Sequence, residues 1–291
     1  EQSYYICRSI AEQALKLIPP QAQSYNSLQD AWAQPLPPLP ADDKIVVVEI
    51  EDEERRFNLN AMRLQDGTIE PNHLQQFQRL LHVVQASPNV ANAVADWLDT
   101  DSTVRLPGGA EAMQYPTYPC KNGLLDSVDE LSLVQGVTAG LLYGSAQGVQ
   151  VKGLAPTPAA SPSQTSTPGT ASGLPGLNTL CTVHSNGKIN VNTANVYVLQ
   201  SIAPSLPPAV AAAMVTQRQE KPFQSLNDLL KVPGFNLSYL FYFQSLAGVT
   251  SSVYRVTATV QGSEGSYLAR VYVQLDPATR LWIPLVWEVH S

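Results

Sequence analysis

Residues 188–235 read KINVNTANVYVLQSIAPSLPPAVAAAMVTQRQEKPFQSLNDLLKVPGF, and this stretch predicts a small, locally connected helical module. It opens with the alternating run Ile189-Asn190-Val191-Asn192, after which Asn192 or Thr193 is suited to cap the first helix. Two prolines precede the second helix, where a first helical turn tolerates them. The predicted helices cover 195–202, 209–217 and a short segment that begins at Ser225.

An earlier stretch of the chain shows the same pattern. Phe57-Asn58-Leu59-Asn60 alternates apolar residues with asparagine as Ile189-Asn190-Val191-Asn192 does. In both places a leucine-bearing helix is predicted next, over 74–84 and 195–202, and an Ala/Val-rich helix follows, over 89–98 and 209–217. We interpret this as a diverged internal duplication. The alternative is a chance likeness between two short asparagine-flanked strands.

The composition is that of a globular chain with a low charge density. Its 291 residues, 44% apolar and 14% charged, suffice for one large or two modest cores. The net charge of −7 argues against broad attraction to nucleic acid or to an anionic membrane. No run approaches the roughly 18 apolar residues that a membrane span needs. Because the chain starts at Glu1 without a methionine, we expect that a leading segment has been removed and that a helix over 1–18 continues an upstream helix.

Four strands are predicted, and they lie far apart in the sequence. The β-branched run at 43–51 is one strand, 252–261 and 266–275 alternate as a hairpin, and 281–289 is the fourth. Together they predict a four-stranded antiparallel sheet into which a helical region is inserted, an α+β fold. The expected division is 1–55 and 249–291 for the sheet domain and 56–248 for the insertion. A flexible loop rich in Pro, Ser and Thr is expected at 153–176.

The acidic residues gather after the helix predicted at 89–98. Asp96, Asp99 and Asp101 are followed by Gly108-Gly109 and Glu111, and such carboxylates on a bent loop suit calcium, a hard cation that takes six to eight oxygen ligands. The spacing is not that of an EF-hand. Asp126 completes the site from a later segment or caps the next helix. The alternative interpretation is a solvated acidic loop at the end of a helix.

Other chemistry finds little support in the sequence. None of the four histidines lies in a metal-ligand pair or beside a nucleophilic serine motif, and no phosphate-binding glycine loop is present. Cys120 lies in a Tyr/Pro loop and Cys181 follows a Gly/Pro/Ser linker. A Cys120–Cys181 disulfide in an oxidising compartment is one expectation, and two free thiols are the other.

The module at 189–235 resembles the helix-hairpin-helix domains of DNA-binding competence proteins. The resemblance is carried by Ile189-Asn190-Val191-Asn192-Thr193-Ala194 and by Pro222-Phe223-Gln224-Ser225-Leu226-Asn227-Asp228-Leu229. Such domains hold phosphate with glycine-rich hairpins, whereas this chain has APSLPP at 203–208, in which prolines delete N–H donors. The module carries only four basic residues against two acidic ones, so we expect it to be architectural, with no nucleic-acid partner.

The whole chain resembles the minor pseudopilin protein K family of bacterial type II secretion systems. The motifs are Phe57-Asn58-Leu59-Asn60, the run ADWLDTD at 95–101 with GGAE at 108–111, NGLLD at 122–126, the run at 189–194 and the closing hairpin. The resemblance implies a pseudopilin fold, an N-terminal helix plus antiparallel sheet, with a large α-helical insertion that contains helix-hairpin-helix-like repeats. It implies calcium in the insertion, and the family's positions correspond here to Asp99, Asp101, Glu111, Asp96 and Asp126.

The same resemblance implies a role and a place. The family caps the tip of a periplasmic pseudopilus, nucleates its assembly for protein export and has no enzymatic activity. The implied partners are two other minor pseudopilins and the major pseudopilin, with secreted proteins as further candidates. The implied location is the periplasmic domain of an inner-membrane protein whose N-terminal transmembrane helix is missing here. The alternative function is a nucleic-acid-binding module of a DNA-uptake machine, and a hydrolase is disfavoured because no nucleophile–base pair is found.

Overall fold

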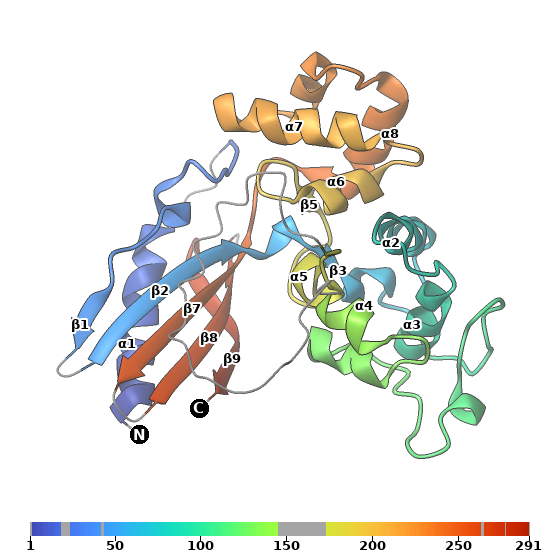
Figure 1. Cartoon of the computed structure of the whole chain (residues 1–291), viewed down its shortest axis with the longest axis horizontal. Helices are drawn as coiled ribbons and strands as arrows, with labels where there is room; N and C mark the ends of the chain where they lie inside the picture. Colours follow the sequence, from blue (N-terminus) through green and yellow to red (C-terminus); the bar gives the residue numbers. More distant parts are fainter. Residues whose placement is uncertain are drawn as a thin grey trace.

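An antiparallel sheet covered by one long helix forms one of the two parts of the molecule, and the other part is helical (Figure 1). The computed structural model describes residues 2–18, 24–41, 44–144, 173–262, 265–276 and 278–290. The strands are β1 (Leu39–Ala41), β2 (Lys44–Asp52), β7 (Val253–Gly262), β8 (Gly265–Leu275) and β9 (Trp282–His290). They pair in the order β1-β2-β7-β8-β9, and every pair is antiparallel. The four predicted strands are therefore confirmed, and the α+β class with them.

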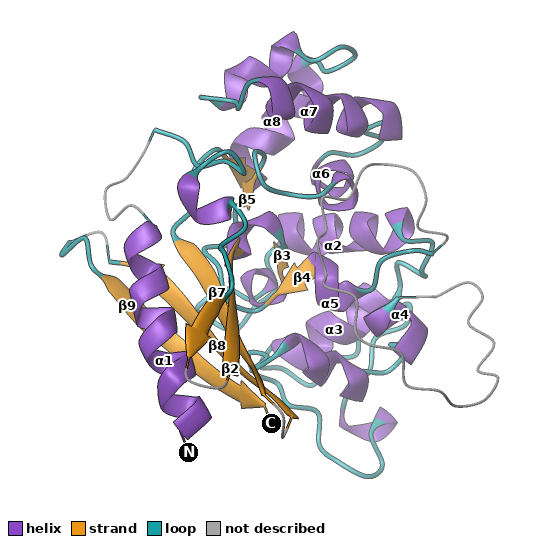
Figure 2. Cartoon of the chain, turned by 60° about the vertical axis from the view of Figure 1, so that its left-hand side comes forward, coloured by secondary structure: helices purple, strands orange, loops and turns teal. Residues whose placement is uncertain are grey.

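Helix α1 (Gln2–Ala14), which a short 3-10 turn, η1 (Leu15–Leu17), extends, lies across one face of this sheet (Figure 2). Alternate residues of β2 and β7, among them Val46, Val48 and Val256, point to that face and bury themselves against the helix. The helix contributes Ala11 and Ala14, whose small side chains allow a close approach. The period-2 pattern of the sequence thus corresponds to a one-sided core.

Strand β1 is an element that the sequence did not predict. Its three residues pair with β2 along the sheet edge, with Pro40 opposite Ile45. Proline cannot donate to a ladder, so it is found in sheets chiefly on edge strands.

The helical half of the chain is inserted between β2 and β7. Its elements are the helices α2 (Pro71–Val83), α3 (Val90–Leu98), α4 (Ala139–Tyr143), α5 (Leu177–Leu180), α6 (Val196–Ile202), α7 (Pro208–Glu220) and α8 (Leu237–Leu246), the 3-10 turns η3 (Glu53–Arg55), η4 (Leu59–Met62), η5 (Ala112–Gln114), η6 (Val128–Leu133) and η7 (Leu226–Lys231), and the short strands β3 (Phe57–Asn58), β4 (Cys181–Thr182), β5 (Ile189–Asn190) and β6 (Ala247–Gly248). The predicted flexible loop lies outside the described residues, except for 173–176. Among the described residues, no helix combines the length and apolar character needed to cross a membrane.

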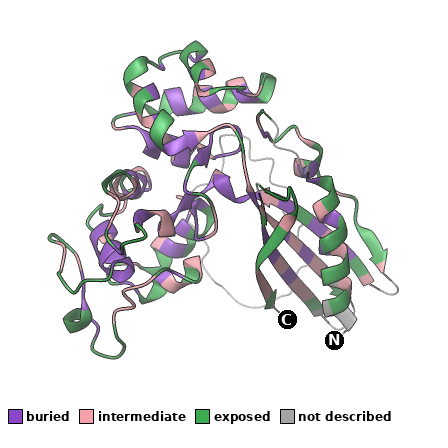
Figure 3. Ribbon diagram, turned by 180° about the vertical axis from the view of Figure 1, so that it is seen from behind, coloured by how far each residue is buried: buried purple, intermediate pink, exposed green. Residues whose placement is uncertain are grey.

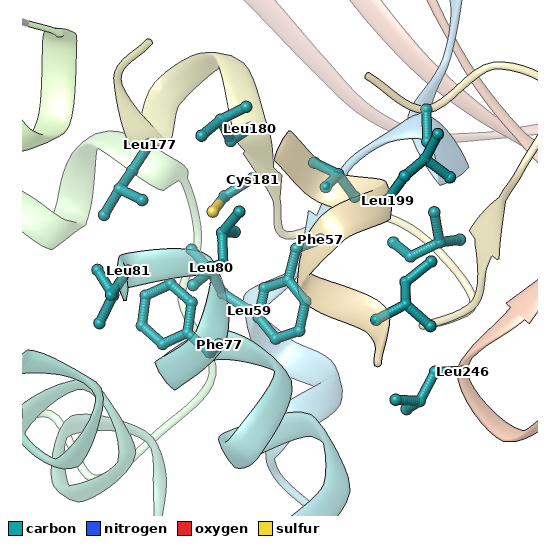
Figure 4. Close-up of a cluster of buried hydrophobic side chains, with 14 of the residues drawn as sticks. Phe57, Leu59, Phe77, Leu80, Leu81, Leu177, Leu180, Cys181, Leu199 and Leu246 are labelled. Atoms are coloured by element: carbon teal, nitrogen blue, oxygen red, sulfur yellow. The ribbon is translucent and has the colours of Figure 1, made fainter. Parts of the chain in front are cut away.

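A second hydrophobic core fills the helical half and is separate from the core of the sheet. Its members run from Phe57 to Ala247, whereas those of the first core come from 11–50 and 254–273. At its centre Phe57 stacks on Phe77 of α2 with ring centroids 5.4 Å apart, beside Leu80 and Leu199 (Figure 4). Figure 3 shows that buried residues gather where the helices meet, while the outer face of α1 is exposed.

The two asparagine motifs make the same contacts, which supports the duplication. In the first, the side chain of Asn60 accepts a hydrogen bond from the N–H of Leu125 (2.8 Å) and donates one to the carbonyl of Leu125 (2.9 Å). In the second, the side chain of Asn192 accepts a hydrogen bond from the N–H of Phe223 (2.8 Å) and donates one to the carbonyl of Phe223 (2.9 Å). Each asparagine thereby fixes the chain just before a 3-10 turn, η6 or η7. Strands β3 and β5 each pair in parallel with a two-residue strand, β4 and β6 respectively.

The prediction that Asn192 or Thr193 caps the next helix is wrong. Asn195 is the cap of α6, and its side chain accepts the N–H of Val198 at 2.9 Å. Asn192 is committed to Phe223, and the hydroxyl of Thr193 donates to Asp52 at 2.6 Å. Both residues face partners more than 30 positions away, which local spacing does not reveal.

Replacing Asn192 with alanine is expected to lower the free energy of unfolding by about 2–3 kcal/mol, because the buried N–H and carbonyl of Phe223 both lose their partner. Asn60→Ala should cost a similar amount through Leu125. The measurement is urea unfolding followed by circular dichroism. Asn227→Ala, at an exposed position of the same module, is the control and should change little. Equal effects of all three substitutions would contradict the role assigned to the asparagine pairs.

Glu54→Gln is expected to flatten the pH dependence of stability. Burial, and then the nearby charge of Asp52, raise the pKa of Glu54 from 4.5 to about 8. The folded state therefore binds an extra proton between these values, and the free energy of unfolding falls as the pH rises from 4.5 to 8. The glutamine variant, which stays neutral, should lose less stability over this range and be the more stable protein at pH 9. Parallel stability–pH curves for the two proteins would refute this.

Candidate metal centre

The loop between α3 and η6 brings three predicted carboxylates together. One oxygen from each of Asp99, Asp101 and Glu111 lies within 4.8 Å of the others. Asp99 follows the last residue of α3 with extended backbone, and its N–H donates to the carbonyl of Ala95 at 2.9 Å, which ties it to the helix end. Glu111 precedes the turn η5, and its own N–H donates to Gln114 Oε1 at 2.9 Å. The helix end and the 3-10 turn thus hold two of the three side chains.

Two of these carboxylates are buried with oxygen atoms that lack partners. Asp99 is fully buried and Glu111 is 3% exposed, whereas Asp101 is open to solvent. Within the described part of the chain, one oxygen of Asp99 and both oxygens of Glu111 lack a hydrogen bond of normal distance and angle, and the weak thiol donor of Cys120 lies beside the Glu111 carboxylate. A buried unpaired carboxylate is costly, and such groups are normally paired or bound to a metal.

The pKa values of the group reflect this imbalance of charge. Burial raises the pKa of Asp99, and burial followed by the charges of Asp96 and Asp99 raises that of Glu111. Asp101 behaves differently, because its carboxylate accepts the N–H of Thr103 at 2.7 Å and this lowers its pKa. The donor set consists of oxygen atoms only, which fits a hard divalent cation such as calcium. A cation between them would supply the missing partner for the buried oxygens.

Asp96 and Asp126, the other two predicted ligands, are not part of this group. Both oxygens of Asp96 are used by Arg105: Oδ1 by its guanidinium (2.8 Å) and Oδ2 by its backbone N–H (3.1 Å). Asp126 is 93% exposed and pairs with Lys121 at 2.7 Å. It does not cap η6 either, since Ser127 precedes that turn and Asp126 donates its own N–H to Glu130.

Gly109 permits the close turn around Asp96. A Cβ at this position would lie 2.2 Å from the carbonyl oxygen of Arg105 and 2.3 Å from Asp96 Oδ2. Glycine is therefore required where the loop folds back on the carboxylate. The glycine pair singled out in the sequence has this local role, and it shapes the loop that carries Glu111.

Sequence reasoning missed two residues of the site. Arg105, the one basic residue between Asp96 and Cys120, reaches both Asp96 and Asp99. Asn122 has a left-handed backbone (φ 47°) and donates to the carbonyl of Asp101 at 2.8 Å, while its buried side-chain oxygen has no partner. A single basic residue in an acidic loop was a usable signal for Arg105. Asn122 begins the NGLLD motif of the family resemblance, but nothing in the sequence indicated its contact with Asp101.

The expected Cys120–Cys181 disulfide is wrong in this structure, where both cysteines are free. Cys181 begins β4 opposite Phe57 and is enclosed in the hydrophobic core of the helical half. Cys120 lies beside the acidic group, where its thiol donates to the carbonyl of Asp96 at 3.6 Å. Burial, followed by nearby acidic charge, raises the pKa of Cys120 to about 11 and keeps it a neutral thiol.

Comparison with known proteins gives the family. A family profile described as type II secretion system protein K matches residues 55–144, and a second profile of the same description matches residues 189–241. The chain is also 31% identical over 218 residues to the type II secretion system protein K of Pseudomonas aeruginosa. It belongs to the type II secretion system protein K family. The profile matches fall on the two copies of the asparagine motif, and the first includes the acidic loop.

The alignment with the Pseudomonas aeruginosa relative covers 71% of this chain and 54% of the relative, so the chain spans about half of that protein's length. Among solved structures, a chain of the GspK-GspI-GspJ complex from the type 2 secretion system of enterotoxigenic Escherichia coli has the same fold. The TM-score is 0.73 at 16% identity, and the match covers 100% of this chain and 95% of that one. The expected pseudopilin-like α+β fold is thereby confirmed.

Glu111→Gln is expected to have opposite effects with and without calcium. In chelator the variant should melt at a higher temperature, because a buried carboxylate without a partner is removed. In millimolar calcium the wild type should gain about 2–3 kcal/mol by binding, as a protein does near 100-fold excess over Kd, and the variant should lose most of this gain. The measurement is thermal unfolding in both buffers.

Asp126→Asn is the matched control for this substitution. It removes an exposed charge 15 residues from Glu111 in sequence that lies outside the acidic group. Its calcium-induced shift in melting temperature should equal that of the wild type. If the Asp126 variant lost the calcium-induced shift while the Glu111 variant kept it, calcium would bind at Asp126 and the site assigned to Glu111 would be wrong.

Proposed function

We propose that this chain is the periplasmic part of a non-enzymatic minor pseudopilin that caps the tip of the type II secretion pseudopilus and nucleates its assembly for protein export. The observation that carries the proposal is the helical half inserted between β2 and β7. These two strands are neighbours in the sheet, paired from Ile45–Gln261 to Asp52–Tyr254, yet about 200 residues separate them. Membership of the protein K family supplies the biological setting.

The position of the insertion explains why a subunit that carries it would lie at the end of a filament. A filament of pilin-like subunits stacks sheet domains along a helical core, so each internal subunit has neighbours above and below. Here the helical half projects from one end of the sheet, beside the point where β2 leaves it (Figure 1). A body wider than the sheet domain would obstruct a further subunit on that side. An end position needs only binding surfaces and no active site.

The partners are proposed to bind through α1 and the sheet. The structural match described above comes from a GspK-GspI-GspJ complex, which makes two other minor pseudopilins the first candidates. The outer side of α1 and of η1 offers a contact surface, with Tyr5 of α1 66% and Leu17 of η1 39% exposed. The major pseudopilin would continue the filament below, and secreted proteins are candidate partners of the exposed tip.

Anchoring and calcium complete the proposal. A transmembrane helix preceding α1 would hold the protein in the inner membrane during assembly, with the described domain in the periplasm. Calcium at Asp99, Asp101 and Glu111 would hold a loop whose carboxylates otherwise repel one another. Its binding free energy would add to the stability of the folded tip by mass action.

Nucleic-acid binding is the alternative, and the contacts of the helical module at 189–235 disfavour it. Arg218 is buried and donates to the carbonyl of Val191 at 2.7 Å, so it is structural. Lys231 pairs with Asp228 at 2.6 Å. The hairpin between α6 and α7 contains prolines in place of the N–H donors that phosphate needs. An electrophoretic shift of DNA at low salt and micromolar protein would revive this alternative.

Tyr5→Glu is expected to abolish co-elution with the soluble domains of the other minor pseudopilins from the same source in size-exclusion chromatography. The added charge would be desolvated in a contact made by the outer face of α1. Phe241→Glu, at an equally exposed aromatic on α8, is the control and should leave the complex intact. Loss of the complex in the Phe241 variant alone would place the partners on the helical half. No complex for the wild type in either calcium or chelator would refute the proposed assembly role.

A further inference from the structure

Arg105 places a positive charge inside the acidic group that would bind the cation. Its guanidinium nitrogen Nη1 donates to Asp96 Oδ1 at 2.8 Å and also contacts Asp99 Oδ2. The backbone of the same residue is fixed at both polar groups, because its N–H donates to Asp96 Oδ2 at 3.1 Å and its carbonyl accepts the N–H of Gly109 at 2.7 Å. The side chain is therefore aimed at Asp99 by its own loop.

This contact divides Asp99 between two charges. Oδ2 is used by Arg105, while Oδ1 is buried and has no partner in the described part of the chain. Asp99 can then offer a cation one free oxygen beside those of Asp101 and Glu111. Asp96 is fully buried with both oxygens satisfied, which makes it the holder of Arg105 and keeps it from acting as a ligand.

We propose that Arg105 is a built-in counter-ion of the metal centre, which partly neutralises the carboxylates without metal and opposes calcium through its contact with Asp99. The proposal rests on the calcium site proposed above. A bound divalent cation and the guanidinium would share Asp99 at a separation of a few ångströms, where even the dielectric constant of water leaves a repulsion worth about tenfold in affinity. The residue therefore lowers calcium affinity while holding the empty loop together.

The consequence is a negative coupling between Arg105 and calcium. Without metal, loss of the guanidinium would leave Asp96 and Asp99 as buried charges without a partner, and the loop would be less stable. With metal, the same loss would remove a repulsion. The increase in the free energy of unfolding that calcium binding gives should thus be larger when Arg105 is absent. This holds whether the loss of Arg105 changes the metal-free or the calcium-bound protein more.

The test compares calcium affinity and melting temperature for the wild type, Arg105→Gln and Lys121→Gln. Lys121→Gln removes a charge of the same sign from the same loop, from a side chain that pairs with Asp126 and Glu130 and touches none of the three clustered carboxylates. Isothermal titration calorimetry with calcium chloride gives Kd, and thermal unfolding in chelator and in calcium gives the shift. We expect Arg105→Gln to bind calcium about tenfold or more tightly and to show the larger shift, and Lys121→Gln to match the wild type.

Arg105→Lys keeps the charge and guards against a variant that fails to fold its loop. It should bind calcium with nearly the wild-type affinity. Weaker calcium binding in both Arg105 variants would show that the side chain only positions ligands and would overturn the proposal, as would an unchanged shift in Arg105→Gln. If the Arg105→Gln variant bound calcium and the wild type did not, the result would support Arg105 as the counter-ion and refute resident calcium in the natural chain. No binding by any of the proteins would refute both.

Discussion

The buried carboxylate of Asp52 holds the two halves of the molecule together. It ends β2, and its Oδ2 accepts hydrogen bonds from Thr193 (2.6 Å), Ser251 (2.6 Å) and Asn190 (3.2 Å), while Oδ1 accepts the N–H of Glu54 (2.8 Å). Asn190 belongs to the second asparagine motif, Thr193 directly follows that motif, and Ser251 lies in the segment that re-enters the sheet. Because a buried charge is tolerated only when it is fully paired, all of these segments must meet at one point for the fold to be stable. The insertion is fixed at its root as a result.

A dense set of ion pairs surrounds this joint and distinguishes neighbouring acids by their partners. Glu51 pairs with Arg55, Arg56 and Arg255, and these cations hold its pKa well below the usual range despite its burial. The carboxyl group of Glu54 accepts hydrogen bonds from the N–H and the hydroxyl of Ser252 and faces no arginine among its described hydrogen bonds, and burial raises its pKa. Four acids in succession can therefore be accommodated because two face arginines and two face hydroxyl and amide donors.

The sequence predicted what depends on local periodicity and missed what depends on distant pairing. The β-branched run of β2 and the alternation of β7 and β8 reveal a one-sided sheet, since each strand carries its own pattern. Three of the five proposed metal residues converge, because a helix end and a glycine turn are local features. Asp96 and Asp126 do not, since the choice between ligand and ion-pair partner was made by Arg105 and Lys121. The proposed disulfide was wrong for the same reason: the surroundings of Cys181 come from Phe57, more than 120 residues earlier.

The duplication explains why the acidic loop can exist at all. Asn60 reaches Leu125 across 65 residues, whereas Asn192 reaches Phe223 across 31, and the difference lies largely in the loop that follows α3. Where the second copy passes from the end of α7 at Glu220 to Phe223 through two residues, the first copy carries Asp99, Asp101, Arg105 and Glu111. Because the asparagine fixes the chain again at Leu125, the loop can accumulate charge without disturbing the packing of either copy. The order of this loop then depends on balancing that charge, which Arg105 does in part from within and which the proposed cation would complete.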